Sequence, residues 1–293
     1  LASSAGAEVV GTITQNLSKH SNTYLGKGKI EELKDLAADL ELDTVICDDE
    51  LNPNQQLNLE KALDGVKVID RTALILDIFA ANALTKEGRL QVELAQHEYL
   101  LPRLAGQWTH LERLGGGIGT RGPGESQIET DRRLARGRIL RLKKDIEKVR
   151  QHRSRYRERR RSSEAKIVAL VGYTNAGKST LLNSLTSAEV VAENRMFSTL
   201  DPVTRRLKLP SGSDVLLTDT VGFIQKLPTT LIAAFRATLE EINEADLILH
   251  VLDVTHDRRV EHSESVKSII AEIGLTEKPI VTILNKWDKF PHE

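Results

Sequence analysis

Gly172-Tyr173-Thr174-Asn175-Ala176-Gly177-Lys178-Ser179 is the stretch that decides the fold class of this chain. It follows an apolar run, residues 166–171, that is typical of a buried parallel strand, and it precedes a helical stretch, residues 180–185. The stretch fits the pattern G-x-x-x-x-G-K-[ST], in which glycines let backbone N–H groups wrap around phosphates at a helix N-terminus. We expect Lys178 to contact the β- and γ-phosphates and Ser179 to ligate Mg²⁺.

Two later tetrapeptides extend this predicted site, and each follows a predicted strand. Asp219-Thr220-Val221-Gly222 comes after residues 215–217; its aspartate can hold Mg²⁺ through a water, and the Gly222 N–H can donate to a γ-phosphate. Asn285-Lys286-Trp287-Asp288 comes after residues 280–284. A carboxylate there accepts two hydrogen bonds from the N1–H and N2–H₂ edge of guanine, which adenine does not present. The three motifs in this order predict a guanine nucleotide site.

The segment Phe197-Ser198-Thr199-Leu200-Asp201, between the first two motifs, is expected to sense the nucleotide. A threonine hydroxyl that reaches Mg²⁺ only when a γ-phosphate is present reports the state of the nucleotide. We choose Thr199 for this role, so that the predicted metal ligands are Ser179, Thr199 and Asp219. Thr204 is the competing threonine, and it is expected to lie on a strand.

Hydrolysis of the γ-phosphate is predicted to depend on Lys178, Thr199 and Gly222. The arrangement resembles that of P-loop GTPases, many of which carry a glutamine after this glycine to orient the attacking water. This chain has Phe223 there, and a phenyl ring neither donates nor accepts a hydrogen bond. We expect slow intrinsic hydrolysis that an external group or a rearrangement accelerates. The alternative is a residue outside these motifs that positions the water.

The rest of the chain suggests two domains before the nucleotide domain. Residues 1–80 alternate helix-like stretches with strand-like runs, which predicts a small α/β domain. The strand-like runs are residues 9–14, 44–47 and 66–69. Residues 81–162 are expected to form an antiparallel helical hairpin around a glycine-rich tip, residues 114–124.

The nucleotide domain, residues 163–293, is predicted to be an α/β domain with a mostly parallel sheet. The chain ends five residues after Asp288, so we expect this domain to be incomplete at its C-terminus. The second arm of the preceding hairpin ends strongly basic, because residues 141–161 hold eleven Lys or Arg and three Asp or Glu. This end is either a contact for RNA phosphates or the solvated face of a packed hairpin.

Composition excludes several classes of protein. Hydrophobic residues make up 40% of the chain, enough for a globular core. No apolar run reaches the roughly 18 residues of a membrane helix. The single cysteine, Cys47, cannot form an internal disulfide, and no apolar N-terminal segment resembles a secretion signal. We therefore expect a cytoplasmic protein. The net charge of −1 means that any nucleic-acid contact must come from local charge segregation.

The sequence resembles the HflX family, in the Obg–HflX branch of translation-associated GTPases, over nearly its whole length. The glycine-rich segment is the most specific part of this resemblance. The resemblance rests on the nucleotide motifs and on four further segments: residues 25–29, 91–96, 114–125 and 128–133. The resemblance implies a Mg²⁺-dependent enzyme that hydrolyses GTP to GDP and phosphate.

By the same resemblance, the protein would bind the large ribosomal subunit and split or rescue stalled ribosomes. Its glycine-rich tip would then reach toward the peptidyl transferase centre. Two alternatives stay open: a ribosome-assembly GTPase, and an RNA-docking module whose nucleotide site only regulates binding. We expect a monomer without a membrane partner.

Overall fold

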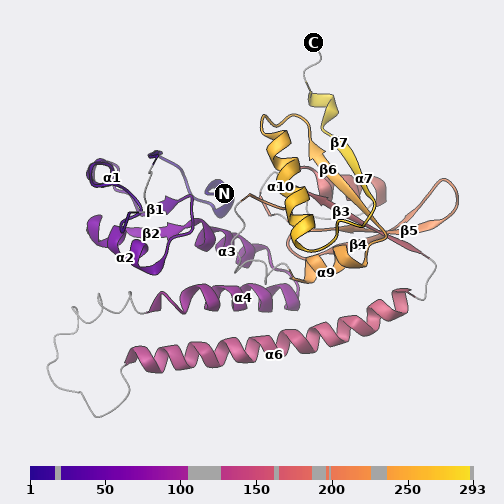
Figure 1. Ribbon diagram of the computed structural model, residues 1–293, viewed down its shortest axis with the longest axis horizontal. Helices are drawn as coiled ribbons and strands as arrows, with labels where there is room; N and C mark the ends of the chain where they lie inside the picture. Colours follow the sequence, from indigo (N-terminus) through magenta and orange to yellow (C-terminus); the bar gives the residue numbers. More distant parts are fainter. Residues whose placement is uncertain are drawn as a thin grey trace. The chain divides into compact units, whose positions relative to one another are not determined.

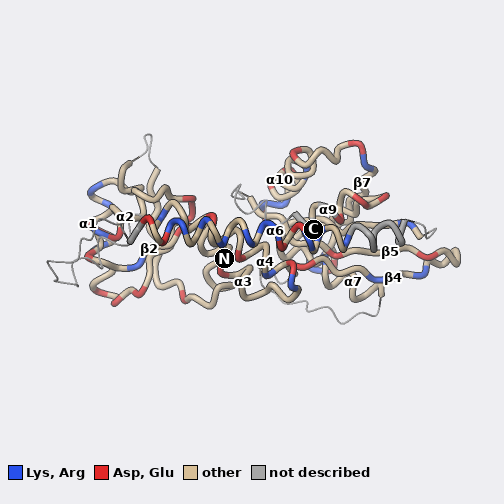
Figure 2. Tube along the Cα trace, turned by 90° about the horizontal axis from the view of Figure 1, so that it is seen from below, with Lys and Arg blue, Asp and Glu red and all other residues tan. Residues whose placement is uncertain are grey.

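The computed structural model describes residues 1–16, 21–104, 127–161, 165–186, 196–197, 199–225 and 236–290. The chain divides into two compact units, one made of Leu1–Ile78 and Glu93–Lys143 and the other of Phe79–Val92 and Lys144–Glu293 (Figure 1). Basic and acidic residues are interspersed along both units, in keeping with the small net charge (Figure 2). None of the described helices is long and apolar enough to cross a membrane.

The first unit contains a two-stranded parallel sheet and the helices around it. Its strands and the helices that begin in it are η1 (Ser3–Ala5), α1 (Lys27–Asp39), β1 (Thr44–Cys47), α2 (Pro53–Ala62), β2 (Lys67–Asp70) and α3 (Arg71–Asn82). The predicted strand at residues 9–14 is wrong, because these residues form no strand. Val9 and Val10 are exposed, so their β-branched side chains lack the packing that favours a strand.

The core of this unit lies between β1, β2 and helices α1 and α2. One cluster of buried residues there comprises Leu33, Cys47, Leu51, Leu59, Leu63 and Val68. The start of α2 is encoded locally: the Asn52 side chain accepts from Gln55 N at 2.8 Å, and the Gln55 side chain accepts from Asn52 N at 3.1 Å. This reciprocal capping, with Pro53 in the first turn, satisfies backbone donors that a helix otherwise leaves unpaired.

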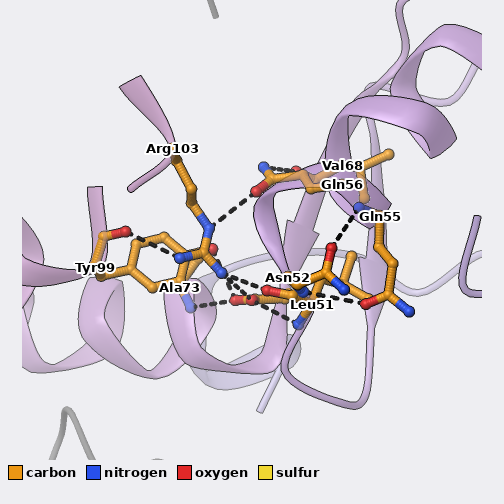
Figure 3. Close-up of polar contacts among 9 residues, drawn as sticks. Leu51, Asn52, Gln55, Gln56, Val68, Ala73, Tyr99 and Arg103 are labelled. Carbon is orange, nitrogen blue, oxygen red and sulfur yellow. Dashed lines mark hydrogen bonds and ion pairs between the residues drawn. The ribbon is translucent and has the colours of Figure 1, made fainter. Parts of the chain in front are cut away.

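A buried ion pair joins the end of β2 to the segment after α4 (Lys86–Leu100). The Asp70 carboxylate, fully buried, accepts from Arg103 at 3.2 Å, from Tyr99 Oη at 2.9 Å and from Leu51 N at 3.0 Å (Figure 3). The Arg103 guanidinium also donates to Leu51 O at 2.5 Å and to Gln56 Oε1 at 3.1 Å. Every oxygen of this carboxylate therefore has a donor, which buried charges require.

Replacing this carboxylate should destabilise the protein strongly. In Asp70→Asn the Arg103 charge stays buried without its counter-charge, and we expect the free energy of unfolding to fall by about 3 kcal/mol. The matched control is Asp64→Asn, whose carboxylate forms an exposed pair with Lys34 at 2.6 Å. We expect a loss below about 1 kcal/mol for the control in urea unfolding, and equal losses in the two variants would contradict the prediction.

The second unit contains a five-stranded sheet in the order β4-β5-β3-β6-β7, in which only β4 runs antiparallel to its neighbour. The mostly parallel sheet predicted from the sequence is confirmed. Its elements are β3 (Lys166–Gly172), α7 (Lys178–Thr186), β4 (Val203–Lys208), β5 (Asp214–Asp219), α9 (Arg236–Glu244), β6 (Leu247–Asp253), α10 (Arg259–Glu272), β7 (Ile280–Asn285) and η2 (Trp287–Lys289).

Strand β3 lies at the centre of this sheet, and its side chains alternate between two hydrophobic clusters. Val168 and Leu170 pack with Leu182 of α7, whereas Ala169 and Val171 belong to the cluster that includes residues of α9 and α10. Helices therefore cover both faces of the sheet (Figure 1). In such sheets ligands bind beyond the carboxyl ends of the strands, where the strand order reverses. The residues that follow β3 occupy this position.

Helices α4 and α6 (Gln127–Arg161) each contribute to both units. In the first unit, Lys143 of α6 pairs with Glu98 of α4 at 2.8 Å. In the second unit, Arg153 of α6 pairs with Glu87 of α4 at 3.0 Å. The two helices therefore contact each other within each unit, and the antiparallel hairpin stays a prediction. The glycine-rich tip, residues 114–124, lies outside the described residues.

Candidate nucleotide-binding site

A hollow lies where β3 meets α7, and its walls are mainly the predicted phosphate loop. It is lined by Thr174, Asn175, Gly177, Lys178, Ser179, Thr180, Phe197, Thr199, Thr220 and Gly222. The loop adopts left-handed backbone at Asn175 (φ 62°) and Gly177 (φ 95°). Glycine and asparagine tolerate this conformation best, which explains these residue types at these positions.

The segment after β5 is fastened to the loop through the backbone. Phe223 N donates to Gly172 O at 3.0 Å, and Thr174 N donates to Phe223 O at 2.8 Å. A Cβ at Gly222 would lie 2.7 Å from Thr174 Cα, so only glycine allows this approach. The Phe223 ring is buried in the core cluster with Ala169, away from the hollow. The ring therefore belongs to the hydrophobic core, and it has no polar group that could orient a water.

Among the described residues, Lys178 is the one lysine that lines the hollow, and its ammonium group lies inside the loop. Lys178 Nζ donates to Gly172 O at 3.2 Å and to Tyr173 O at 3.0 Å. Burial lowers the pKa of Lys178 to about 8, an effect that the Asp219 carboxylate opposes. Carbonyl oxygens and one carboxylate compensate this cation only in part, so a bound phosphate would stabilise its charged form.

The three predicted metal ligands meet at one side of the hollow. Ser179 Oγ lies 2.8 Å from Thr199 Oγ1 and donates to Asp219 Oδ2 at 2.6 Å. Asp219 is fully buried, and its Oδ1 has no hydrogen-bond partner among the described residues. Burial raises the pKa of Asp219, against the opposing effects of Lys178 and Ser179. An orphaned carboxylate oxygen beside two hydroxyls fits a hard divalent cation such as Mg²⁺, which prefers oxygen ligands.

The predicted base-recognition motif begins against the phosphate loop. Asn285 Nδ2 donates to Ala176 O at 2.8 Å, and Lys286 Nζ donates to Asn175 O at 2.9 Å. Lys286 also pairs with Asp253 at 2.7 Å. These contacts fix the motif to the loop. Trp287 and Asp288 follow in η2, and both are exposed, so a ligand can reach their side chains.

Several residues that the sequence assigns to the nucleotide have side chains engaged elsewhere. Tyr173 stacks on His262, with ring centroids 3.6 Å apart, and Thr220 Oγ1 donates to Leu170 O at 2.6 Å. Val221 and Leu200 are buried and do not line the hollow. These residues can meet a nucleotide only through their backbone.

The Asp201 carboxylate also lies outside the hollow and contacts the start of α4. Its partner there, Thr85, belongs to no motif, so the sequence gives no sign of this contact. Ser198 lies outside the described residues.

The fold and this site define a P-loop protein of the GTPase class. Residues 1–80 match the family described as "GTP-binding GTPase N-terminal". Residues 82–160 match the family described as "GTP-binding GTPase Middle Region", and residues 167–286 match the family described as "50S ribosome-binding GTPase". The chain belongs to the HflX family of GTPases and is a GTP-hydrolysing enzyme.

Relatives and solved structures support this assignment over nearly the whole chain. GTPase HflX of Alkalihalophilus pseudofirmus is 57% identical over 290 residues, which are 99% of this chain and 68% of the relative. GTPase HflX of Escherichia coli K12 is 47% identical over 98% of this chain and 68% of the relative. A GTP-binding protein from Sulfolobus solfataricus, solved in complex with GDP, is 28% identical with a TM-score of 0.51, covering 99% of this chain and 78% of that one.

The lowered pKa of Lys178 predicts that nucleotide binding takes up a proton. With a pKa of about 8, Lys178 is partly neutral at pH 8, and a bound diphosphate raises the pKa. We expect net proton uptake at pH 8 that becomes smaller as the pH falls to 7, where the lysine is already mostly charged. Calorimetric titration with GDP in two buffers of different ionisation enthalpy measures this uptake, and no uptake at pH 8 would contradict the prediction.

Proposed function

We propose that this protein binds GTP with Mg²⁺ in the hollow and couples its hydrolysis to association with the large ribosomal subunit. The single observation that carries the nucleotide part is the meeting of Ser179, Thr199 and Asp219 beside the Lys178 ammonium. Support for the ribosomal part comes from the family description of residues 167–286 as a 50S ribosome-binding GTPase. Splitting or rescue of stalled ribosomes is the role that we propose.

In the proposed mechanism, the loop amides and Lys178 hold the β- and γ-phosphates. Ser179, Thr199 and Asp219 would hold Mg²⁺, which would neutralise charge at the phosphate oxygens. Gly222 N–H donates to the γ-phosphate. Asn285 keeps the base motif at the loop, and Asp288 accepts from guanine.

The intrinsic rate is expected to be low, because nothing at position 223 can orient the attacking water. The ring of Phe223 is buried, and the hollow is lined on that side by Gly222 and Thr220. A group from a partner, or a rearrangement that the partner induces, would supply the missing orientation. Ribosomal subunits are the partner that we propose for this step.

The proposed partner surface combines the glycine-rich tip, residues 114–124, with the basic end of the second helical arm. We propose that the tip reaches the peptidyl transferase centre, since a segment poor in side chains fits a narrow RNA space. Residues 150–161 would contact RNA phosphates. We retain the division into residues 1–80, 81–162 and 163–293 as the proposed domain organisation, and we propose a monomeric, cytoplasmic protein.

Sedimentation with purified ribosomal particles tests this function. We expect the protein to co-sediment with large subunits in the presence of a non-hydrolysable GTP analogue and less in the presence of GDP. We also expect GTP turnover to rise when large subunits are added. A variant that lacks residues 115–124 should keep GTP binding but lose any effect at the peptidyl transferase centre.

Two other outcomes would favour other functions. Co-sedimentation without acceleration of turnover would favour an RNA-docking module, for which the eleven Lys or Arg in residues 141–161 are the supporting observation. Preference for immature over mature large subunits would favour a ribosome-assembly GTPase.

A further inference from the structure

The segment that carries Thr199 is held by residues 79–88, which belong to no nucleotide motif. On one side of Thr199, the Phe197 ring packs edge-on against Phe79, with ring centroids 4.8 Å apart and an interplanar angle of 88°. Both rings are buried. Phe197 has a φ of 60°, a strained conformation for an aromatic residue, which persists only where surrounding contacts compensate the strain.

On the other side of Thr199, the Asp201 carboxylate binds the residues at the start of α4. Its Oδ2 accepts from Leu84 N at 2.9 Å and from Thr85 N at 2.8 Å. Its Oδ1 accepts from the Thr85 hydroxyl, which in turn accepts from Gly88 N at 3.0 Å. A carboxylate at a helix N-terminus also interacts favourably with the helix dipole. Asp201 is therefore anchored by three donors and by the dipole.

These two anchors determine where Thr199 can lie. Thr199 lies two residues from each anchor, Phe197 and Asp201, so only a short length of backbone joins it to either one. Between them, Thr199 Oγ1 lies 2.8 Å from Ser179 Oγ, at the proposed metal site. We therefore expect a displacement of Asp201 to move Thr199 relative to Ser179.

We propose that Thr85 is a positioning residue for GTP hydrolysis: it anchors Asp201 and thereby holds Thr199 at the metal site. The proposal rests on the function proposed above. It assigns a task in hydrolysis to the turn between α3 and α4, whose residues are not among those that line the hollow. A structural role for Thr85 in capping α4 would affect stability alone, whereas positioning affects the GTP-bound state.

Gly88→Ala separates these two roles. Alanine favours a helix more than glycine does, so the change should not weaken α4. A Cβ at Gly88 would collide with the Asp201 carboxylate, since Asp201 Cγ would lie 3.1 Å away. We expect kcat to fall about tenfold, because Asp201 loses bonds to a charged group. Gly137→Ala in α6 is the matched control, because a Cβ there would meet only the Arg141 side chain at 3.9 Å.

Thr85→Val and Thr85→Ser test the hydroxyl itself. Valine cannot donate to Asp201, and we expect kcat to fall about fivefold, a smaller effect because water competes at this exposed site. Serine restores the donor and should return kcat to within about twofold of the parent. Affinity for a non-hydrolysable GTP analogue should fall in the valine and Gly88→Ala variants, while GDP affinity stays unchanged.

The possible outcomes are distinguishable. Unchanged kcat and an unchanged ratio of analogue to GDP affinity in Gly88→Ala would overturn the proposal, as would equal losses of GTP analogue and GDP. If Thr85→Val does not fold, the kcat and nucleotide affinities of Gly88→Ala, compared with those of Gly137→Ala, are sufficient to test the proposal. A parent protein that fails to hydrolyse GTP in the presence of Mg²⁺ and large subunits would instead refute the proposed function.

Discussion

Lys178→Ala should lower the affinity for GTP at least about 100-fold, because a buried cation is lost from the phosphate loop and each hydrogen bond to a charged group contributes about 1.5–3 kcal/mol. The ammonium group lies within 3.2 Å of two loop carbonyls, at the carboxyl end of β3. In the variant, the loop carbonyls remain and would face the phosphates without an intervening cation. The expected loss therefore includes repulsion as well as the missing bonds.

Fluorescent GTP and GDP titrations measure this effect. Lys208→Ala is the matched control, because it removes the same charge from an exposed position on β4, and we expect GTP affinity to stay within about twofold. Thermal unfolding without nucleotide checks that Lys178→Ala still folds, because the variant leaves the buried Asp219 carboxylate without this cation. Retained GTP affinity in a folded Lys178→Ala variant would refute the assignment of the phosphate loop.

The phosphate loop could be predicted from the sequence because its chemistry is local. Eight consecutive residues, a preceding apolar run and a following helix are all encoded within residues 166–186. The meeting of Ser179 with Asp219 follows from the fold class, since β3 and β5 are parallel neighbours whose carboxyl ends adjoin. The sequence thus predicts that the proposed metal ligands lie in one region. The structure shows in addition that Asp219 Oδ1 has no hydrogen-bond partner among the described residues.

Features that depend on distant partners could not be predicted. Residues 9–14 have strand composition but lack a neighbouring strand. Thr204, in contrast, lies on β4 as expected from the sequence. The anchor between Asp201 and Thr85 joins residues 116 apart in sequence. Thr85 precedes α4 as an ordinary helix cap, so its sequence context indicates a cap and gives no sign of the carboxylate that it binds.

Asp288→Asn should weaken GTP binding about 100-fold and favour xanthine nucleotides, because an amide replaces the carboxylate that accepts from guanine N1–H and N2–H₂. Xanthine carries a carbonyl oxygen where guanine carries the amino group. The asparagine amide can donate to this oxygen and still accept from N1–H. The preference for XTP over GTP should therefore rise by at least about 100-fold.

The contacts of the base motif hold the segment before Asp288 against the proposed phosphate loop. Asn285 and Lys286 bind carbonyls of the phosphate loop at 2.8 and 2.9 Å, and the left-handed Lys286 (φ 59°) turns the chain into η2. Asp288 lies exposed in η2, two residues beyond Lys286. A ligand whose phosphates occupy the hollow therefore has its base recognised from a segment that cannot shift independently of the loop.

Competition titrations with GTP, XTP and ATP against fluorescent GDP measure the change in base preference. Asp39→Asn, an exposed carboxylate at the end of α1, is the matched control and should leave all three affinities unchanged. Equal weakening of GTP and XTP would mean that Asp288 acts on the fold of η2 rather than on the base. Unchanged GTP affinity would show that Asp288 does not bind the base. Guanine recognition would then require a carbonyl or amide acceptor elsewhere, because the N1–H and N2–H₂ groups that distinguish guanine from adenine need a hydrogen-bond acceptor.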